Sequence, residues 1–153
     1  MLITINYHIK HIMKKIILCD IDGTIANNDH RQHFLEGKKD WDGFFSELKN
    51  DLPNKKIINQ IIDLQSKGKK IIFITGRPER YRYSTEKWLS KYFTFEIEVI
   101  MRKNNDRKNK LDTKKEMFDL RFNSDEIYCC FENDDLLIEL WTSLGIDTIK
   151  VNQ

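Results

Sequence analysis

The sequence has no long hydrophobic run. No apolar stretch approaches the ~20 residues that a membrane-spanning helix requires, and the first dozen residues lack the small-residue cleavage pattern of a signal peptide. Internal repeats and low-complexity tracts are absent as well. We therefore expect a globular protein with no membrane partner.

Cysteine is scarce, with Cys19, Cys129 and Cys130 all lying in apolar runs of strand length. An odd number of cysteines in buried strands indicates reduced thiols in a cytoplasmic protein rather than a disulfide framework. No cysteines and histidines have the spacing of a zinc site. The Gly-x-x-x-x-Gly-Lys-Ser/Thr loop is also missing, so nothing indicates a P-loop kinase.

The charge balance excludes little, because 33% of residues are charged but the net charge is only +2. Both small-molecule and nucleic-acid partners stay open. The 153 residues suit one domain with a sizeable core. Met13-Lys14-Lys15 has the form of a second start, so we expect residues 1–12 to be a dispensable extension and 13–153 to be a single domain.

Apolar runs of strand length alternate with helical patterns along the whole chain. The expected strands are 15–18, 70–74, 95–101, 126–131 and 147–151. The expected helices are 30–35, 41–48, 55–67, 78–91, 112–120 and 136–144. This alternation predicts a parallel sheet of about five strands with helices on both faces. Right-handed crossovers then bring the carboxyl ends of the strands to one edge.

Two carboxylates stand at the end of the first strand. Asp20 and Asp22 are two residues apart, so they can point the same way at a strand end. Like charges that close are costly unless a cation neutralises them or one carries a proton. The pair therefore indicates a Mg²⁺ site or a nucleophile beside a general acid. The alternative is a simple Asp-x-Asp-Gly turn.

Other polar residues are expected at the same edge, from the ends of the second and fourth strands and the helix after the third. They are Thr75, Arg77, Lys114, Glu132 and Asn133. Asp20 can act as a nucleophile, and Asp22 can protonate a leaving oxygen and then activate water. Thr75 can donate hydrogen bonds to phosphoryl oxygens, and Lys114 can offset negative charge. Thr75-Gly76-Arg77 can instead be a strand-to-helix turn. Lys114 can instead be a solvated surface lysine, in which case Lys110 is the alternative lysine of the site.

Four segments resemble, in order, the motifs of the haloacid dehalogenase (HAD) superfamily of phosphohydrolases. They are Asp20-Ile21-Asp22-Gly23-Thr24, Thr75-Gly76-Arg77, Lys114 and Glu132-Asn133, and the likeness spans residues 15–151. The resemblance implies an α/β, HAD-type Rossmann-like three-layer fold with a minimal helical cap. It also implies an aspartyl-phosphate intermediate on Asp20. Mg²⁺ would be held by Asp20, the backbone carbonyl of Asp22, and Glu132 or Asn133.

A closer resemblance is to the 3′-phosphatase domains of bacteriophage polynucleotide kinases. The segments that carry it are His30-Arg31, residues 40–45, Asp51-Leu52-Pro53, residues 101–103 with 106–108, and residues 139–141 with Gly145. In that group, arginines that match Arg31 and Arg77 assist the phosphatase reaction. The kinase half has no counterpart here, which implies a free-standing phosphatase.

Two positions depart from that group. Asn133 stands where the group usually has Asp, so we expect weaker metal binding, with Asp134 or Asp135 as alternative ligands. Lys110 stands four residues before Lys114, where the group has Asp. The partner that orients Lys114 is therefore open, and Asp112 is the nearest acid in sequence.

Three features of the sequence bear on the kind of substrate that the protein binds. Arg102 to Lys110 is rich in cations and forms either a solvated loop or a contact to a nucleic-acid backbone. We expect Gly76, Arg102 and Arg107 to bind substrate. Trp41, Phe44 and Phe45 favour core packing over a base-stacking platform. Because the segment between Asp22 and Thr75 has room only for a small cap, the site is expected to admit a polymer end.

The sequence thus predicts a Mg²⁺-dependent phosphomonoesterase that removes the 3′-phosphate from DNA or RNA ends. One alternative is a nucleotidase or another small-molecule phosphatase of the same superfamily. Another is a nucleic-acid-binding module that has lost catalysis, which the changes at Asn133 and around Lys114 suggest.

Overall fold

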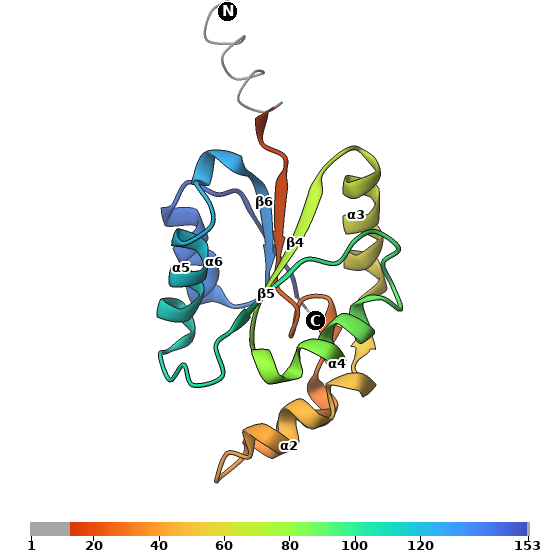
Figure 1. Ribbon diagram of the computed structural model, residues 1–153, viewed down its shortest axis with the longest axis vertical. Coiled ribbons are helices and arrows are strands. Elements are labelled where there is room, and N and C mark those ends of the chain that lie inside the picture. Colours follow the sequence, from red (N-terminus) through yellow and green to blue (C-terminus); the bar gives the residue numbers. More distant parts are fainter. Residues whose placement is uncertain (1–12, 153) are drawn as a thin grey trace, which may run out of the picture.

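Five parallel strands form a single central sheet in the computed structural model, which describes residues 13–152 (Figure 1). The strands are β1 (Ile16–Cys19), β4 (Lys70–Pro78), β5 (Val99–Arg102), β6 (Ile127–Glu132) and β7 (Thr148–Lys150). Their order is β5-β4-β1-β6-β7. The predicted α/β three-layer fold is confirmed. The expectation for residues 1–12 lies outside the described residues.

Strand β1 is the centre of this order, because it pairs with β4 on one side and β6 on the other. The chain first builds outward from β1 through β4 to β5, then returns to place β6 and β7 on the opposite side. Ligands of open α/β sheets bind at such a reversal, outside the carboxyl ends of the strands. The ends of β1, β4 and β6 are therefore neighbours.

Helices cover both faces of the sheet (Figure 1). Helices α3 (Lys55–Ser66) and α4 (Arg82–Leu89) lie on one face, and α5 (Lys110–Asp119) and α6 (Asp135–Ser143) on the other. Side chains alternate along a strand, so Ile17 of β1 packs into the α3–α4 core and Leu18 into the α5–α6 core. Trp88 and Trp141 are the largest buried side chains of these two cores.

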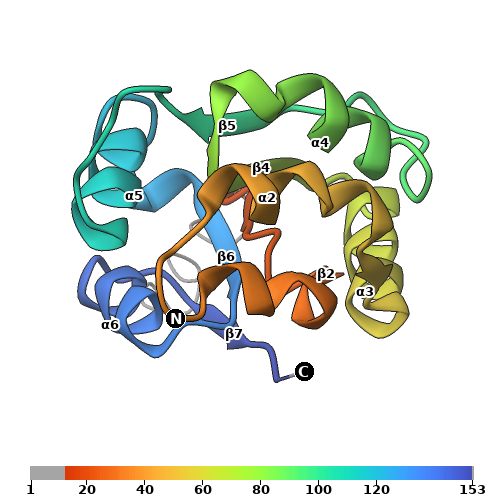
Figure 2. The same cartoon turned by 90° about the horizontal axis from the view of Figure 1, so that it is seen from below.

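A small cap lies over the carboxyl edge of the sheet, as Figure 2 shows from that side. It comprises β2 (Ala26–Asn27), the 3-10 helix η1 (Asp29–Leu35), α2 (Trp41–Ser46), the 3-10 helix η2 (Leu48–Asn50) and β3 (Leu52–Pro53). Phe44, Phe45 and Leu48 form its separate hydrophobic cluster. The minimal cap is thus present, with a short antiparallel β2–β3 pairing that the sequence analysis missed.

Some predicted boundaries were wrong. The helix expected from residue 78 begins later, because β4 continues to Pro78, where it pairs with Arg102 of β5. The 3-10 helix η3 (Glu79–Tyr81) then leads into α4. The strand expected over 95–101 starts only at Val99, and residues 30–35 form a 3-10 helix rather than an α-helix. A last 3-10 helix, η4 (Ser124–Glu126), precedes β6.

All three cysteines are free and buried in strands β1 and β6, as expected. Burial raises the pKa of each thiol, that of Cys129 to about 12. Among the described residues, no helix has the length and hydrophobicity needed to cross a membrane.

Candidate active site

Asp20 follows β1 and lies at the centre of a buried polar cluster. Its Oδ1 accepts a hydrogen bond from Lys114 Nζ at 2.6 Å, and its Oδ2 accepts one from Thr24 Oγ1 at 2.9 Å. Lys114 Nζ also donates to Glu132 Oε2 at 3.0 Å. One lysine therefore links two carboxylates that come from adjacent strands.

Burial, together with the nearby carboxylate of Glu132, raises the pKa of Asp20 to about 7, although Lys114 opposes the shift. The same two carboxylates raise the pKa of Lys114 even though its burial acts the other way. Lys114 therefore stays charged, while Asp20 exchanges a proton near neutral pH.

This arrangement predicts a pH-dependent stability. A folded-state pKa of about 7 exceeds the 3.8 of a free Asp, so the folded protein holds a proton that the unfolded chain releases. With chelator present, we expect the free energy of unfolding of the wild type to fall relative to Asp20→Asn between about pH 4 and pH 7. The total is on the order of 4 kcal/mol. Urea denaturation at several pH values measures it, and parallel pH curves for the two proteins would contradict the prediction.

Glu132 is the partner that orients Lys114. Its Oε1 accepts the backbone N–H groups of Asn133 at 3.0 Å and Asp134 at 3.2 Å, which leaves Oε2 facing the lysine. Lys110, the rival lysine, instead pairs with Asp134. Asp112 is not the partner either, since it lies at the start of α5 and accepts from Asn109.

Lys114→Met is expected to impair turnover of phosphate esters. The change leaves Asp20 and Glu132 facing each other without a cation, so the pKa of Asp20 rises above about 7 and fewer molecules carry the carboxylate. Loss of the positive charge also removes about 10²–10³-fold in rate, as for other electrostatic stabilisers. The measurement is kcat/KM against pH, whose acidic limb should move upward. Lys115→Met, at an exposed neighbour in a surface pair with Asp119, is the matched control.

Asp22 is held by two buried arginines. Its Oδ1 accepts from Arg31 Nη2 at 2.5 Å and from Arg77 Nη2 at 2.7 Å, and its Oδ2 accepts from Arg77 Nε at 2.9 Å. Burial disfavours the charged carboxylate, but Arg77 and Arg31 outweigh it and lower the pKa of Asp22 to about 2. The structure thus places both predicted arginines on the second carboxylate.

Asp51 is a site residue that the sequence analysis missed. Its buried carboxylate accepts from Arg31 Nε and Nη2, each at 2.7 Å, from Arg77 Nη2 at 3.1 Å, and contacts His30 Nε2 at 2.9 Å. Asp22 and Asp51 therefore both form ion pairs with Arg31 and Arg77. The one signal for it in the sequence is the Asp51-Leu52-Pro53 segment, which is part of the resemblance to the 3′-phosphatase domains.

Polar groups of Asp20, Asp22 and Asn133 come together where the ends of β1 and β6 meet. The Asn133 amide lies 3.2 Å from Asp20 Oδ2 and 3.2 Å from the Asp22 carbonyl oxygen, in the orientation in which its nitrogen donates to both. A half-turn of the amide presents its oxygen instead. A Cβ added to Gly23, whose φ is +80°, would lie 2.3 Å from the nearest atom of the Asn133 amide, so glycine is needed for this approach.

The oxygens at this place fit Mg²⁺, which prefers one or two carboxylates with carbonyl oxygens and water. Among the described residues, no three His, Cys, Asp or Glu side chains are grouped as metal ligands. The groups that meet at this position are the Asp20 carboxylate, the Asp22 carbonyl and the Asn133 amide. Glu132 Oε2 binds Lys114, while its Oε1 also lies 3.2 Å from the Asn133 amide nitrogen in that orientation. Asp134 caps α6 by accepting from Leu136 and Leu137. The metal-ligand roles of Asp20, Asp22, Asn133 and Glu132 stay predictions.

Thr75 and Gly76 belong to β4 rather than to a strand-to-helix turn. Thr75 Oγ1 is buried and accepts the N–H of Arg77 at 3.2 Å, so its own hydrogen is available to a ligand. Gly76 does not have a positive φ. Its missing side chain instead leaves space beside Arg102, whose Nη2 would lie 3.9 Å from an added Cβ.

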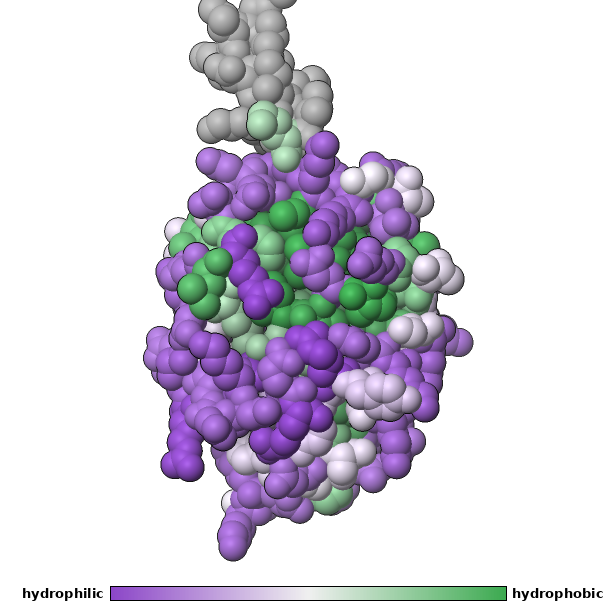
Figure 3. Space-filling model, viewed as in Figure 1, coloured by the Kyte–Doolittle hydropathy of each residue, from purple (hydrophilic) through white to green (hydrophobic). Residues whose placement is uncertain are grey.

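The three predicted substrate-binding residues, Gly76, Arg102 and Arg107, line one groove of about 530 Å³. Arg102 is braced there, because its Nη1 donates to the carbonyl oxygens of Lys108 at 2.9 Å and Asp106 at 3.4 Å. The surface over this loop and over α2 is mainly hydrophilic (Figure 3). The groove thus runs from Gly76, which lies between Thr75 and Arg77 in β4, along the space between the cap and the loop after β5.

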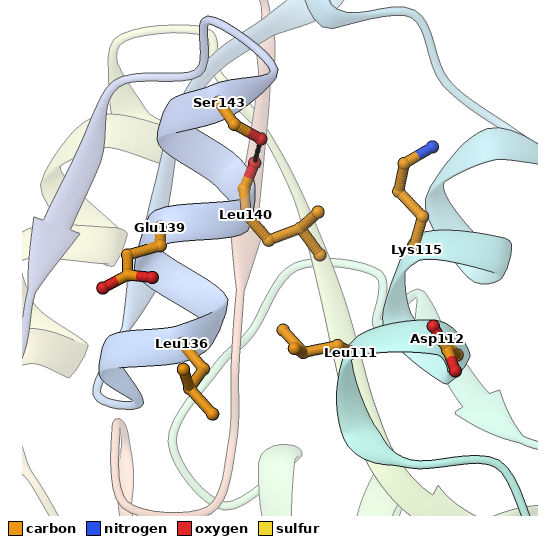
Figure 4. Close-up of a pocket in the computed structure, with 7 residues that line it drawn as sticks. All are labelled: Leu111, Asp112, Lys115, Leu136, Glu139, Leu140 and Ser143. Atoms are coloured by element: carbon orange, nitrogen blue, oxygen red, sulfur yellow. Dashed lines mark hydrogen bonds between the residues drawn. The ribbon is translucent and has the colours of Figure 1, made fainter.

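A second hollow, of about 350 Å³, lies between α5 and α6 (Figure 4). Leu111, Leu136 and Leu140 give it an apolar lining. None of the residues that surround Asp20 or Asp22 lines it, so it is separate from the candidate active site.

This fold and the acids Asp20 and Asp22, with Lys114 and the Asn133 amide beside them, define a HAD-type phosphatase, an enzyme that hydrolyses phosphate monoesters. A family model described as "Polynucleotide kinase PNKP phosphatase domain" matches residues 14–153. The chain belongs to this family.

Solved structures agree with the assignment. A chain from a structure of the Pnkp1/Rnl/Hen1 complex is 25% identical with a TM-score of 0.75, over 92% of this chain and 46% of that one. A chain from a structure of the Pnkp1/Rnl/Hen1 RNA repair complex is also 25% identical. Its TM-score is 0.76, over 92% of this chain and 43% of that one. This protein therefore spans less than half of those chains.

A class C acid phosphatase from Bacillus anthracis, solved with tungstate bound, shares the fold. It is 17% identical with a TM-score of 0.59, over 99% of this chain and 72% of that one. No curated protein matches the chain.

Proposed function

We propose that this protein is a Mg²⁺-dependent polynucleotide 3′-phosphatase that acts through an aspartyl-phosphate on Asp20. The observation that carries the proposal is the cation-lined groove, whose lining includes Gly76 of β4, between Thr75 and Arg77. Arg77 in turn binds the Asp22 carboxylate. The family assignment supports it, as does the likeness to chains of a Pnkp1-containing RNA repair complex.

In the first step, an oxygen of the Asp20 carboxylate attacks phosphorus and the bond from phosphorus to the 3′-oxygen breaks. The leaving oxygen takes a proton from the Asp22 carboxyl group. In this proposal, Lys114 and the Thr75 hydroxyl stabilise the charge on the phosphoryl oxygens. The products of this step are a 3′-hydroxyl end and a phosphorylated Asp20.

In the second step, Asp22 takes a proton from a water molecule, which attacks phosphorus and releases inorganic phosphate from Asp20. The same residue thus serves as acid and then as base. Bound Mg²⁺ would be held by Asp20, the Asp22 carbonyl and Asn133, and would neutralise charge on the phosphoryl group. Asn133 in place of an acid lowers the negative charge of the site, so we propose that Mg²⁺ binds more weakly.

The arginines give Asp22 its changing role. With Arg31 and Arg77 bound, its pKa of about 2 keeps it ionised. A phosphate group offers competing oxygens to the same guanidinium groups, which form strong bidentate hydrogen bonds with phosphate. Drawing one arginine away raises the pKa of Asp22 toward the range that a general acid needs.

The experiment that tests the proposal measures phosphate release from three substrates, each with Mg²⁺ and with chelator. They are an oligonucleotide with a 3′-phosphate, the same strand with a 5′-phosphate, and the matching mononucleotide. We expect selective, Mg²⁺-dependent loss of the 3′-phosphate. Release mainly from the mononucleotide would assign the protein to nucleotide metabolism, and no release from any substrate would indicate a binding module.

A further inference from the structure

Trp41 is the one exposed residue among the three aromatic residues of α2, so the expectation that it packs in a core was wrong. Phe44 and Phe45 are 5% and 8% exposed and form the cap cluster, as the sequence analysis expected, whereas Trp41 is 47% exposed. It lines the groove on the cap side. A half-exposed tryptophan in a groove is a feature of ligand recognition rather than of core packing.

The ring of Trp41 is held in place from several sides. Phe45 stacks with it at a centroid distance of 6.0 Å and an interplanar angle of 22°, and Phe44 meets it edge-on at 5.9 Å. The preceding residue, Asp40, caps α2 by accepting the N–H of Gly43 at 2.9 Å. Because ring and helix start are both fixed, Trp41 offers an aromatic surface at little cost in side-chain entropy.

The next residue ties α2 to the strand that carries Thr75. Asp42 Oδ1 accepts from Arg80 Nη2 and from the Tyr81 hydroxyl, each at 2.8 Å. Arg80 and Tyr81 belong to η3, directly after β4. The cap wall of the groove is therefore connected to the catalytic edge of the sheet.

Cations predominate in the rest of the groove lining. Five of them, with one acid, line it: Arg80, Arg102, Arg107, Lys108, Lys110 and Asp106. Asp106 is occupied by Lys108 Nζ at 3.2 Å and by the Thr113 hydroxyl at 3.0 Å. Within residues 13–152, the Arg107 guanidinium has no ion pair and no hydrogen bond, so its charge is available to a ligand.

From this juxtaposition we infer that the groove binds a single-stranded 3′ end, with a base of the last two nucleotides stacked on Trp41 and a backbone phosphate on Arg107. The inference rests on the proposed function, because it extends the same site along its substrate. A volume of about 530 Å³ suits a ligand of nucleotide size and not a double helix. Stacking also requires a base that is free of its pairing partner, and it tolerates any sequence.

Binding tests this inference without turnover. The probe is a fluorescently labelled single strand ending in a 3′-phosphate, titrated in chelator and followed by anisotropy. Base–aromatic stacking is worth about 1–3 kcal/mol, so Trp41→Ala should raise the Kd by about 5- to 150-fold, while Trp41→Phe restores most of the affinity. Tyr83→Ala, at an exposed aromatic residue of α4 outside the groove lining, is the matched control.

The decisive step repeats the titration with strands that lack the base at either of the last two nucleotides. If Trp41 stacks on a base, one of these strands binds wild type and Trp41→Ala equally. If Trp41→Ala instead loses the same affinity for the intact strand and for both abasic strands, Trp41 has a structural role and the inference is overturned. That result leaves the proposed function intact, because selective release of a 3′-phosphate is measured separately. If phosphate release fails instead, the binding series still decides the inference.

Salt dependence tests the role of Arg107. Each phosphate neutralised on a single strand contributes a slope of about −0.7 to log K against log salt concentration. Arg107→Ala should reduce the slope by about this amount, whereas Lys56→Ala, at an exposed position on α3, should not. An unchanged slope for Arg107→Ala would remove that residue from the inferred contact.

Discussion

Asp20→Asn is expected to abolish phosphate release while the protein stays folded. The amide cannot attack phosphorus, and removal of a catalytic nucleophile costs about 10⁴-fold or more in kcat. The substitution also removes a carboxylate that burial and Glu132 disfavour, since its pKa is raised to about 7. At pH 8 we therefore expect a Tm equal to or above that of the wild type.

Two measurements check this prediction, phosphate release under single-turnover conditions and thermal unfolding. Asp63→Asn provides the matched control, because Asp63 is an exposed aspartate of α3 whose partner is Lys67, the residue directly after that helix. Residual turnover within tenfold of the wild type would show that Asp20 is not the nucleophile. A Tm lowered by several degrees would show that its carboxylate stabilises the fold instead.

Asp51→Asn is expected to have the largest effect on stability. The neutral amide leaves Arg31 and Arg77 buried with only Asp22 as an anionic partner, and breaking a buried ion pair on one side costs about 3–5 kcal/mol. The arginines also shift relative to Asp22. Misplacement of a catalytic group by about 1 Å costs on the order of 100-fold in rate.

Urea denaturation and kcat measure the two effects of Asp51→Asn. His30→Ala gives a graded comparison, because His30 is partly exposed and contacts the same carboxylate at 2.9 Å without holding an arginine. We expect a much smaller loss of stability for His30→Ala. Equal losses for the two variants would mean that the arginine pair does not depend on Asp51.

The sheet was predictable because its signals are local. Apolar runs such as Ile71 to Ile74 are buried from both faces, so they differ clearly from the amphipathic helices between them. The boundaries were less predictable where pairing alone decides them. Residues 95–98 carry no signal that β5 begins at Val99, opposite Phe73 of β4, the strand beside it in the described part of the chain.

The candidate site was predictable to a similar degree and for a related reason. Strand ends are visible in the sequence, so the convergence of Asp20, Thr75 and Glu132 followed from the topology. Contacts between the cap and the sheet were not visible, because they depend on how the cap folds over the edge. Asp51 and the exposed position of Trp41 belong to this group, and both became apparent only in three dimensions.

The long-range contacts of the site have a consequence for how the protein becomes active. Lys114 and Asp20 are 94 positions apart in the chain, and Arg77 and Asp22 are 55 apart. Contacts of such separation form late, because closing long loops must precede them. Helices can therefore appear early in refolding while no competent site exists. Recovery of phosphatase activity should follow recovery of helical content. The time course of activity during refolding therefore measures when the central sheet is complete.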